Sequence, residues 1–156
     1  MTQSHFSPDV LEFLRLLARH EVQYLLVGGE AVIYHGYPRL TGDVDFFYDR
    51  SPANAERLFA ALTEFWQGRV PAVESAAELS EPDLVVQFGR PPNRIDLLSS
   101  AGSVAFDSAW ARRVTTSLAT PDGAVPLQII GRADLVRTKR DAGRHKDLDD
   151  IEHLSG

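Results

Sequence analysis

A glycine pair and a pair of aspartates constrain this chain more than any other feature of its sequence. Thirteen residues separate Gly28-Gly29 from the acidic sequence Asp43-Val44-Asp45. The β-prone run 22–27 ends at the glycines, and the apolar and aromatic residues of 43–48 predict a second strand. Side chains alternate along a strand, so the two aspartates share a face with Cα atoms roughly 6.6 Å apart. Two such carboxylates can share a divalent cation, and glycines after a strand let the backbone approach a phosphate.

Hydrophobic periodicity and turn residues predict helices and strands along the whole chain. Ser7-Pro8 and Ser51-Pro52 are typical helix starts, and Asp122-Gly123 is a typical hairpin turn. We expect strands at 22–27, 43–48, 84–88, 94–98, 114–119 and 125–130, and helices at 8–20, 30–35, 52–65, 75–79, 105–112, 132–142 and 146–154.

The predicted elements indicate the fold class. Some strands are joined by hairpins and others through helices, so we expect an α/β (α+β) fold with a mixed β-sheet flanked by helices. The chain has 156 residues, of which 44% are hydrophobic. This size predicts a single domain at 1–156, with a C-terminal helical segment at 131–154.

Asp96 is the best candidate for a third metal ligand. The sequence Arg94-Ile95-Asp96-Leu97-Leu98 places its carboxylate within an apolar strand. Two metal ions held about 4 Å apart around a phosphoryl group need such an additional acid. Mg²⁺ prefers oxygen ligands, usually one or two carboxylates together with water and phosphates. The sequence leaves open the alternative that Asp96 faces solvent on an edge strand.

The composition excludes several kinds of site. The chain has no cysteine, which removes disulfides, thiolate metal sites and cysteine nucleophiles, and fits a reducing compartment such as the cytoplasm. The first residues lack the basic and apolar character of a signal peptide. No segment approaches the roughly 20 apolar residues needed to span a bilayer, so we expect a cytoplasmic protein without a membrane partner.

The net charge of −6 is unevenly distributed along the chain. Residues 132–146 carry six basic and two acidic side chains, a local balance of +4. The overall acidity argues against a broad nucleic-acid-binding surface, because phosphate contacts require a basic patch. The basic segment itself fits a local anion site and a solvated helix face equally well.

The order of these motifs resembles the signature of the nucleotidyltransferase superfamily that includes DNA polymerase β. That signature is a hydrophobic residue, Gly, then Gly or Ser, a spacer, and finally acid, hydrophobic, acid, hydrophobic, which residues 27–46 match. His35-Gly36, Arg39-Leu40-Thr41 and the segment 135–151 look more narrowly like small prokaryotic nucleotidyltransferases related to toxins of type IV toxin–antitoxin systems. The resemblance spans nearly the whole chain.

The resemblance implies a role for each matching residue. Asp43, Asp45 and Asp96 would be catalytic and would bind the metal ions, Mg²⁺ or Mn²⁺, with Asp96 helping to activate the attacking hydroxyl. A second set would bind the nucleotide, with the glycines at its phosphates and the lysine facing its triphosphate: Gly28, Gly29, Arg39, Thr41, Lys139 and Asp147.

The sequence therefore predicts a metal-dependent nucleotidyltransferase that moves a nucleoside monophosphate from an NTP to a hydroxyl acceptor. The acceptor would be an RNA end (for example of a tRNA), a protein or a small molecule, and a toxin of this kind would have an antitoxin partner. The alternative is a catalytically inactive nucleotide-binding or interaction module of a toxin–antitoxin or regulatory system. A metal-dependent nuclease is less well supported, because an acid-x-lysine pair near the aspartates is missing.

Overall fold

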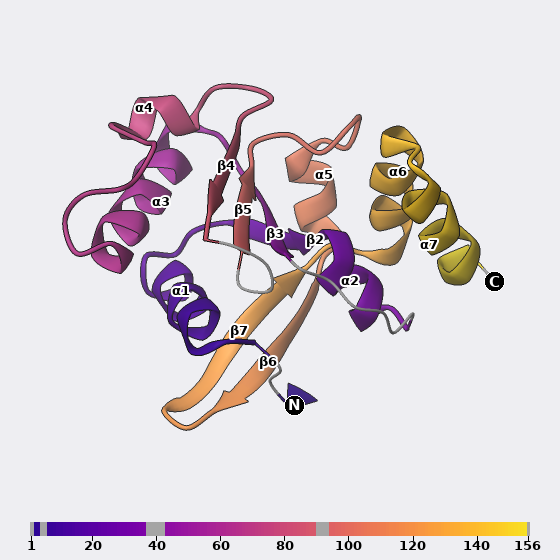
Figure 1. The fold of residues 1–156 in the computed structure, drawn as a ribbon, viewed down its shortest axis with the longest axis horizontal. Helices are drawn as coiled ribbons and strands as arrows, with labels where there is room; N and C mark the ends of the chain where they lie inside the picture. The colour runs from indigo at the N-terminus through magenta and orange to yellow at the C-terminus, as the bar shows by residue number, and fades with distance from the viewer. Residues whose placement is uncertain (1, 4–5, 37–42, 90–93, 156) are drawn as a thin grey trace.

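Helices and strands alternate along the part of the chain that the computed structural model describes, residues 2–3, 6–36, 43–89 and 94–155 (Figure 1). The helices are α1 (Pro8–Arg19), α2 (Gly28–Tyr34), α3 (Pro52–Phe65), α4 (Ala76–Leu79), α5 (Phe106–Ala111), α6 (Arg132–Ala142) and α7 (His145–Ser155). The strands are β1 (Thr2–Gln3), β2 (Tyr24–Val27), β3 (Asp43–Tyr48), β4 (Val85–Phe88), β5 (Arg94–Leu98), β6 (Val114–Thr120) and β7 (Gly123–Ile129).

The strands form one mixed sheet, which within the described residues has seven strands in the order β1-β6-β7-β2-β3-β5-β4. Hairpin neighbours β4–β5 and β6–β7 pair antiparallel, as does β2–β3. The pairs β3–β5, β2–β7 and β1–β6 are parallel. The predicted α/β fold with a mixed, helix-flanked sheet is confirmed, and β3 lies between β2 and β5, as its apolar sequence indicated.

Alternating side chains of β3 contact different helices on the two faces of the sheet. Phe46 packs edge-to-face on Phe13 of α1, with ring centroids 5.3 Å apart, whereas Phe47 packs on Phe106 of α5 at 5.2 Å. In Figure 1, α1, α3 and α4 lie to one side of the sheet, and α2, α5, α6 and α7 lie to the other. Asp43 and Asp45 have the same parity as Phe47, so they point toward the side that carries α5.

Most helix boundaries follow from local sequence signals. The Ser7 and Ser51 hydroxyls accept hydrogen bonds from the backbone N–H groups of Val10 and Asn54, and a proline follows each serine. Gly143 ends α6 in the left-handed conformation, with φ 66°. The bounds of β3 and α6 are those predicted.

Several predicted bounds differ from the structure by one or two residues, and one strand was not predicted. Helix α2 begins at Gly28 and not at residue 30, because glycine, although a weak helix former, lets the chain turn directly from β2 into the helix. The two-residue strand β1 was not predicted, since so short a segment carries no periodicity.

The C-terminal segment forms the two expected helices, α6 and α7, which pack against each other. None of the helices in the described ranges combines the length and the hydrophobicity that crossing a membrane requires.

Candidate metal centre

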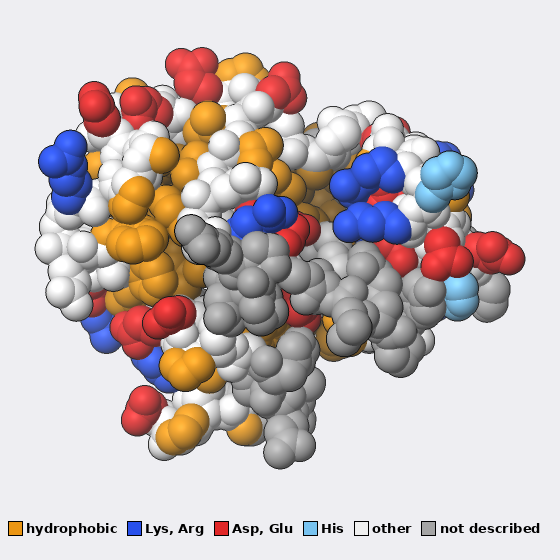
Figure 2. Space-filling model, viewed as in Figure 1, with side chains coloured by type: hydrophobic (Ala, Val, Ile, Leu, Met, Phe, Trp, Pro, Cys, Tyr) orange, Lys and Arg blue, Asp and Glu red, His pale blue; other side chains and the backbone are white. Residues whose placement is uncertain are grey.

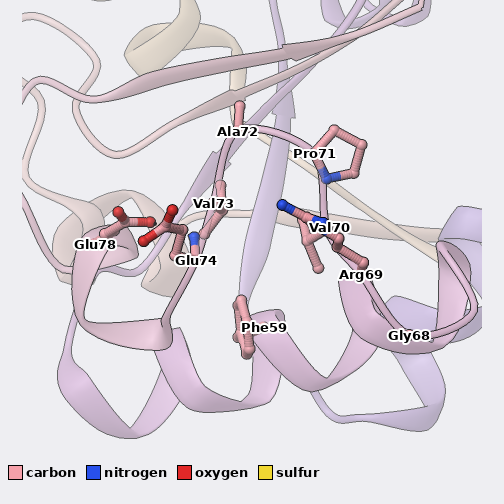
Figure 3. A pocket seen from close by; sticks show the side chains of 9 residues that line it. All are labelled: Phe59, Gly68, Arg69, Val70, Pro71, Ala72, Val73, Glu74 and Glu78. Atoms are coloured by element: carbon pink, nitrogen blue, oxygen red, sulfur yellow. Dashed lines mark hydrogen bonds between the residues drawn. The ribbon is translucent and has the colours of Figure 1, made fainter.

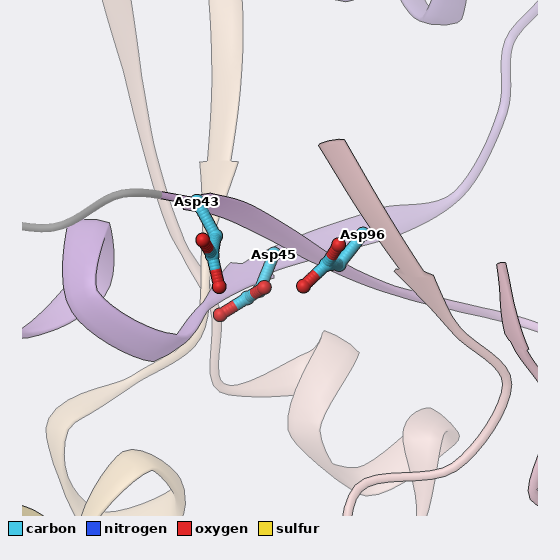
Figure 4. A group of neighbouring side chains, drawn as sticks. All are labelled: Asp43, Asp45 and Asp96. Atoms are coloured by element: carbon cyan, nitrogen blue, oxygen red, sulfur yellow. The ribbon is translucent and has the colours of Figure 1, made fainter. Parts of the chain in front are cut away.

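Three aspartates from two neighbouring strands meet on one face of the sheet (Figure 4). Strands β3 and β5 run parallel, with Asp43 opposite Arg94 and Asp45 opposite Asp96. Each aspartate offers a carboxylate oxygen, and these oxygens all lie within 4.8 Å of one another. Asp96 is therefore adjacent to the Asp43–Asp45 pair, and the alternative of a solvent-facing aspartate is wrong because Asp96 is only 5% exposed.

The surroundings of Asp45 raise the pKa of its carboxyl group. Burial, followed by a hydrogen bond and the charge of Asp96 and by the charge of Asp43, raises the pKa of Asp45 to about 7. The positive charge of Lys139 lowers this pKa in part. Asp45 therefore keeps its proton to a pH near 7, far above the range of an ordinary carboxyl group.

Gly28 lies directly beside the side chain of Asp45. Val27 lies opposite Asp45 in the β2–β3 ladder, and the next residue, Gly28, has φ 64°. A Cβ atom at this position would overlap the Oδ2 atom of Asp45. A glycine is thus required at residue 28 both by the backbone conformation and by the carboxylate beside it. Gly29 follows as a buried residue of α2.

Arg94 lies among the three carboxylates, although the sequence motifs did not single it out. Its Nη2 atom lies 2.6 Å from Asp43 Oδ2 and 3.3 Å from Asp96 Oδ2. Its Nε atom lies 3.1 Å from Asp96 Oδ1, but the angles do not make a hydrogen bond. The available signal was the spacing, because Arg94 stands two residues before Asp96 and so shares its face of β5.

Lys139 and Asp147 belong to one buried ion-pair network between α6 and α7. Lys139 Nζ lies 3.3 Å from Asp147 Oδ1 and 3.1 Å from Asp150 Oδ2, and all three side chains are at most 6% exposed. The charge of Lys139 acts on Asp45, so the network borders the aspartate cluster. The structure therefore places Lys139 close to the site, but inside an ion pair. Asp150 was not predicted as part of it.

Arg144 connects this network to the surface. Its Nε atom donates a 2.5 Å hydrogen bond to Asp147 Oδ2, and its side chain is 64% exposed. Burial alone would raise the pKa of Asp147, but hydrogen bonds and charges from Arg144 and Lys139 outweigh it and lower that pKa. The negative charge of Asp45 also contributes to the raised pKa of Arg144, after the hydrogen bond with Asp147. Arg144 was missed in the sequence, although its i, i+3 spacing to Asp147 was a usable signal.

Apart from Lys139, the basic residues of the segment 132–146 are exposed on α6, on α7 and between them. Figure 2 shows Lys and Arg side chains gathered over this part of the molecule. Its exposed basic residues are Arg132, Arg137, Arg140, Arg144 and Lys146. Most of the local positive charge is thus a solvated helix surface, whereas Lys139 alone of the six basic residues is buried.

The other predicted site residues are placed as follows. Arg39 and Thr41 lie outside the described residues. Glu30, the acid after the glycine pair, lines an apolar cavity of about 340 Å³ together with Leu26 and Leu118.

Five cavities among the described residues are lined by residues other than the three aspartates. One, of about 500 Å³, lies beside Phe59 of α3 and the segment 68–74 (Figure 3). Its Glu78 carboxylate accepts a hydrogen bond from the Glu74 backbone N–H, 2.6 Å long. The Glu78 carboxylate is thus already hydrogen-bonded to the backbone of the same loop, and we assign this cavity no chemistry.

The donor set at the aspartate cluster fits a hard divalent cation. It consists of carboxylate oxygens without histidine or cysteine, which suits Mg²⁺ or Mn²⁺ and not a structural zinc ion. Asp96 Oδ1 is buried without a hydrogen-bond partner among the described residues, and Arg94 Nε makes an ionic contact with it at 3.1 Å. No protein-family model and no curated protein matches the sequence.

Proposed function

We propose that this protein is a metal-dependent nucleotidyltransferase, similar to the DNA polymerase β superfamily, that moves a nucleoside monophosphate from an NTP to a hydroxyl. The observation that carries the proposal is the meeting of Asp43, Asp45 and Asp96 beside the glycine turn into α2. Phosphoryl transfer depends on positioning and charge neutralisation more than on covalent catalysis by protein groups. Three carboxylates and the nearby cationic side chains can supply this positioning and charge neutralisation, and the reaction needs no cysteine nucleophile.

In the proposed reaction, the acceptor hydroxyl oxygen forms a bond to the α-phosphorus of the NTP. The bond from that phosphorus to the oxygen bridging to the β-phosphate breaks, and pyrophosphate leaves with the electron pair. Asp96, a buried carboxylate of the cluster, is suited to accept the hydroxyl proton. Divalent cations bound by the aspartates would neutralise phosphate charge and lower the pKa of the hydroxyl.

The cationic residues near the cluster would have different tasks. Lys139 is held by Asp147 and Asp150, so its contribution is a fixed positive charge beside Asp45. Arg144 presents an exposed guanidinium from the same network and is the better candidate for a direct phosphate contact. Gly28 and Gly29, with Arg39 and Thr41, complete the nucleotide-binding set that the motif resemblance implies.

The acceptor belongs to the proposal only as a class. An RNA end such as that of a tRNA is compatible with the exposed basic residues of α6 and α7. A protein or a small molecule that carries a hydroxyl group would serve equally as the acceptor. If the chain is a toxin of a toxin–antitoxin system, as the resemblance suggests, an antitoxin would be its partner in the cytoplasm.

The proposal is tested by transfer of radioactive label. The protein is incubated with Mg²⁺ or Mn²⁺, total cellular RNA or protein, and each NTP labelled either at the α- or at the γ-phosphate. Label from the α-phosphate is expected to reach the acceptor, and label from the γ-phosphate to appear in pyrophosphate. The variants Asp43→Asn and Asp96→Asn should abolish transfer, whereas Asp122→Asn in the β6–β7 turn should leave it unchanged, since that side chain is 79% exposed.

Two results would contradict the proposal. Equal labelling by the wild type and by Asp43→Asn would show that the aspartates do not carry the reaction. Metal-dependent nucleotide binding without transfer to any acceptor would instead favour the inactive binding module.

A further inference from the structure

Arg94 contacts two of the three aspartates of the cluster. It stands opposite Asp43 in the β3–β5 register and two residues before Asp96, so all three side chains share one face of the sheet. Its Nη2 atom contacts Asp43 Oδ2 at 2.6 Å and Asp96 Oδ2 at 3.3 Å. A metal ion that bridges these two aspartates needs lone pairs of the same carboxylates and adds two positive charges beside the guanidinium.

A comparison within the molecule shows that Arg94 is shared between two carboxylates. Arg112 binds the buried Asp134 alone, through two parallel hydrogen bonds, Nε to Oδ2 at 2.9 Å and Nη2 to Oδ1 at 2.8 Å. Arg94 approaches Asp96 with two nitrogens, Nε at 3.1 Å from Oδ1 and Nη2 at 3.3 Å from Oδ2, but its shortest contact is with Asp43. An arginine that served only to hold Asp96 would be expected to give that carboxylate its shortest contacts.

Within the ranges that the structure describes, Arg94 is the cationic residue seen in contact with the cluster. Lys139 acts on Asp45 by its charge but is itself paired with Asp147 and Asp150. Arg144 is paired with Asp147. In the metal-free protein, the direct cationic contacts to Asp43 and Asp96 seen among the described residues therefore come from Arg94.

We infer that Arg94 is a resident counter-ion of the aspartate cluster, which a divalent cation must displace from Asp43 and Asp96 in order to bind. This inference rests on the proposed function, since it takes the three aspartates as metal ligands. Arg94 then sets the threshold of metal concentration at which the site is loaded. It also keeps the carboxylates close together on the sheet when no metal is bound.

The first experiment measures Mn²⁺ binding at pH 8 by titration followed by electron paramagnetic resonance. Removal of the competing cation in Arg94→Gln should tighten Mn²⁺ binding about tenfold, the affinity equivalent of one charge-assisted hydrogen bond. Arg112→Gln, which removes an arginine from a buried aspartate outside the cluster, should bind Mn²⁺ like the wild type. Circular dichroism of each variant verifies that it is folded.

The second experiment uses only the wild type, so that it does not depend on the folding of a variant. Phenylglyoxal modifies accessible guanidinium groups, and peptide mass spectrometry gives the rate at each arginine. Saturating Mg²⁺ should raise the rate at Arg94 severalfold and leave the rate at Arg112 unchanged.

The outcomes separate this inference from the proposed function. Weaker or equal Mn²⁺ binding by Arg94→Gln would show that Arg94 orients the ligands and does not compete with the metal, and would overturn the inference alone. An unchanged or lower modification rate at Arg94 with Mg²⁺ would do the same. If neither the wild type nor Arg94→Gln binds Mn²⁺, the inference and the proposed metal site are both wrong.

Discussion

Replacement of Asp45 by asparagine should stabilise the metal-free protein at alkaline pH. The pKa of Asp45 in the folded protein is about 7, against an ordinary value of 3.8. Because the folded state binds this proton more tightly than the unfolded state does, the stabilising contribution is complete below about pH 4 and is lost as the pH rises through 7. A difference of about 3 pKa units corresponds to at most about 4 kcal/mol, and partial access of solvent makes the expected loss about 2–4 kcal/mol.

The physical reason is the burial of Asp45 and its contact with Asp96 and Asp43. Asparagine has nearly the shape of aspartic acid but cannot ionise, so Asp45→Asn keeps the neutral form at every pH. The difference in stability between the two proteins should be smallest at the acidic end, pH 5, where Asp45 of the folded wild type is still protonated. At pH 8.5 the variant should be the more stable by about 2–4 kcal/mol.

The assay is urea denaturation of both proteins in EDTA at several pH values between 5 and 8.5. The difference between wild type and Asp45→Asn removes the contributions of other groups, including the five histidines, that titrate in the same range. Addition of Mg²⁺ or Mn²⁺ at pH 8.5 should restore stability to the wild type by about 2.7 kcal/mol at one hundred times the dissociation constant, and much less to the variant.

A difference between the two proteins that stays constant from pH 5 to 8.5 would refute this reasoning. It would mean that Asp45 ionises without cost, and that the neighbouring carboxylates are not coupled as the structure indicates.

Substitutions of Gly28 and of Lys139, each with a comparison variant, test the residues around the site. Gly28→Ala should cost about 2–4 kcal/mol, since it combines a left-handed backbone with overlap on Asp45, whereas Gly143→Ala, with a similar φ but only an ordinary 3.8 Å contact, should cost about 1–2 kcal/mol. Chemical denaturation measures both, and equal losses would show that the carboxylate contact at Gly28 has no effect. Lys139→Met should cost about 3–5 kcal/mol because it leaves buried carboxylates without their ammonium partner, and adding Asp147→Asn should recover part of that loss. A loss below 1 kcal/mol by thermal or urea unfolding would argue against the buried network.

Local sequence signals were sufficient to predict most of the secondary structure. The bounds of β3 at Asp43–Tyr48 and of α6 at Arg132–Ala142 follow from periodicity, and Ser7 and Ser51 identify two helix starts. Such signals act over a few residues, so one sequence is enough to detect them. The prediction that Asp96 lies near Asp45 needed one further assumption. It was that the two apolar strands that carry these aspartates are neighbours in the sheet.

The charge pairing of the site was not predictable in the same way. Arg94 contacts Asp43 across a separation of 51 residues, and that contact depends on the register of the parallel β3–β5 pair. A shift of one residue would place the guanidinium on the other face of the sheet. Likewise, the burial of Lys139 depends on how α7 packs on α6, which the local +4 balance of the segment does not specify.

The central claim, that Asp43, Asp45 and Asp96 together hold divalent cations, is tested most directly by crystals grown with Mn²⁺ and a non-hydrolysable NTP analogue. An anomalous difference map identifies manganese by its anomalous scattering, which the light atoms of the protein lack. We expect a peak about 2.0–2.2 Å from oxygens of these aspartates, with Arg94 withdrawn from Asp43. A map without a peak at the three carboxylates, under conditions in which the analogue is bound, would contradict the account.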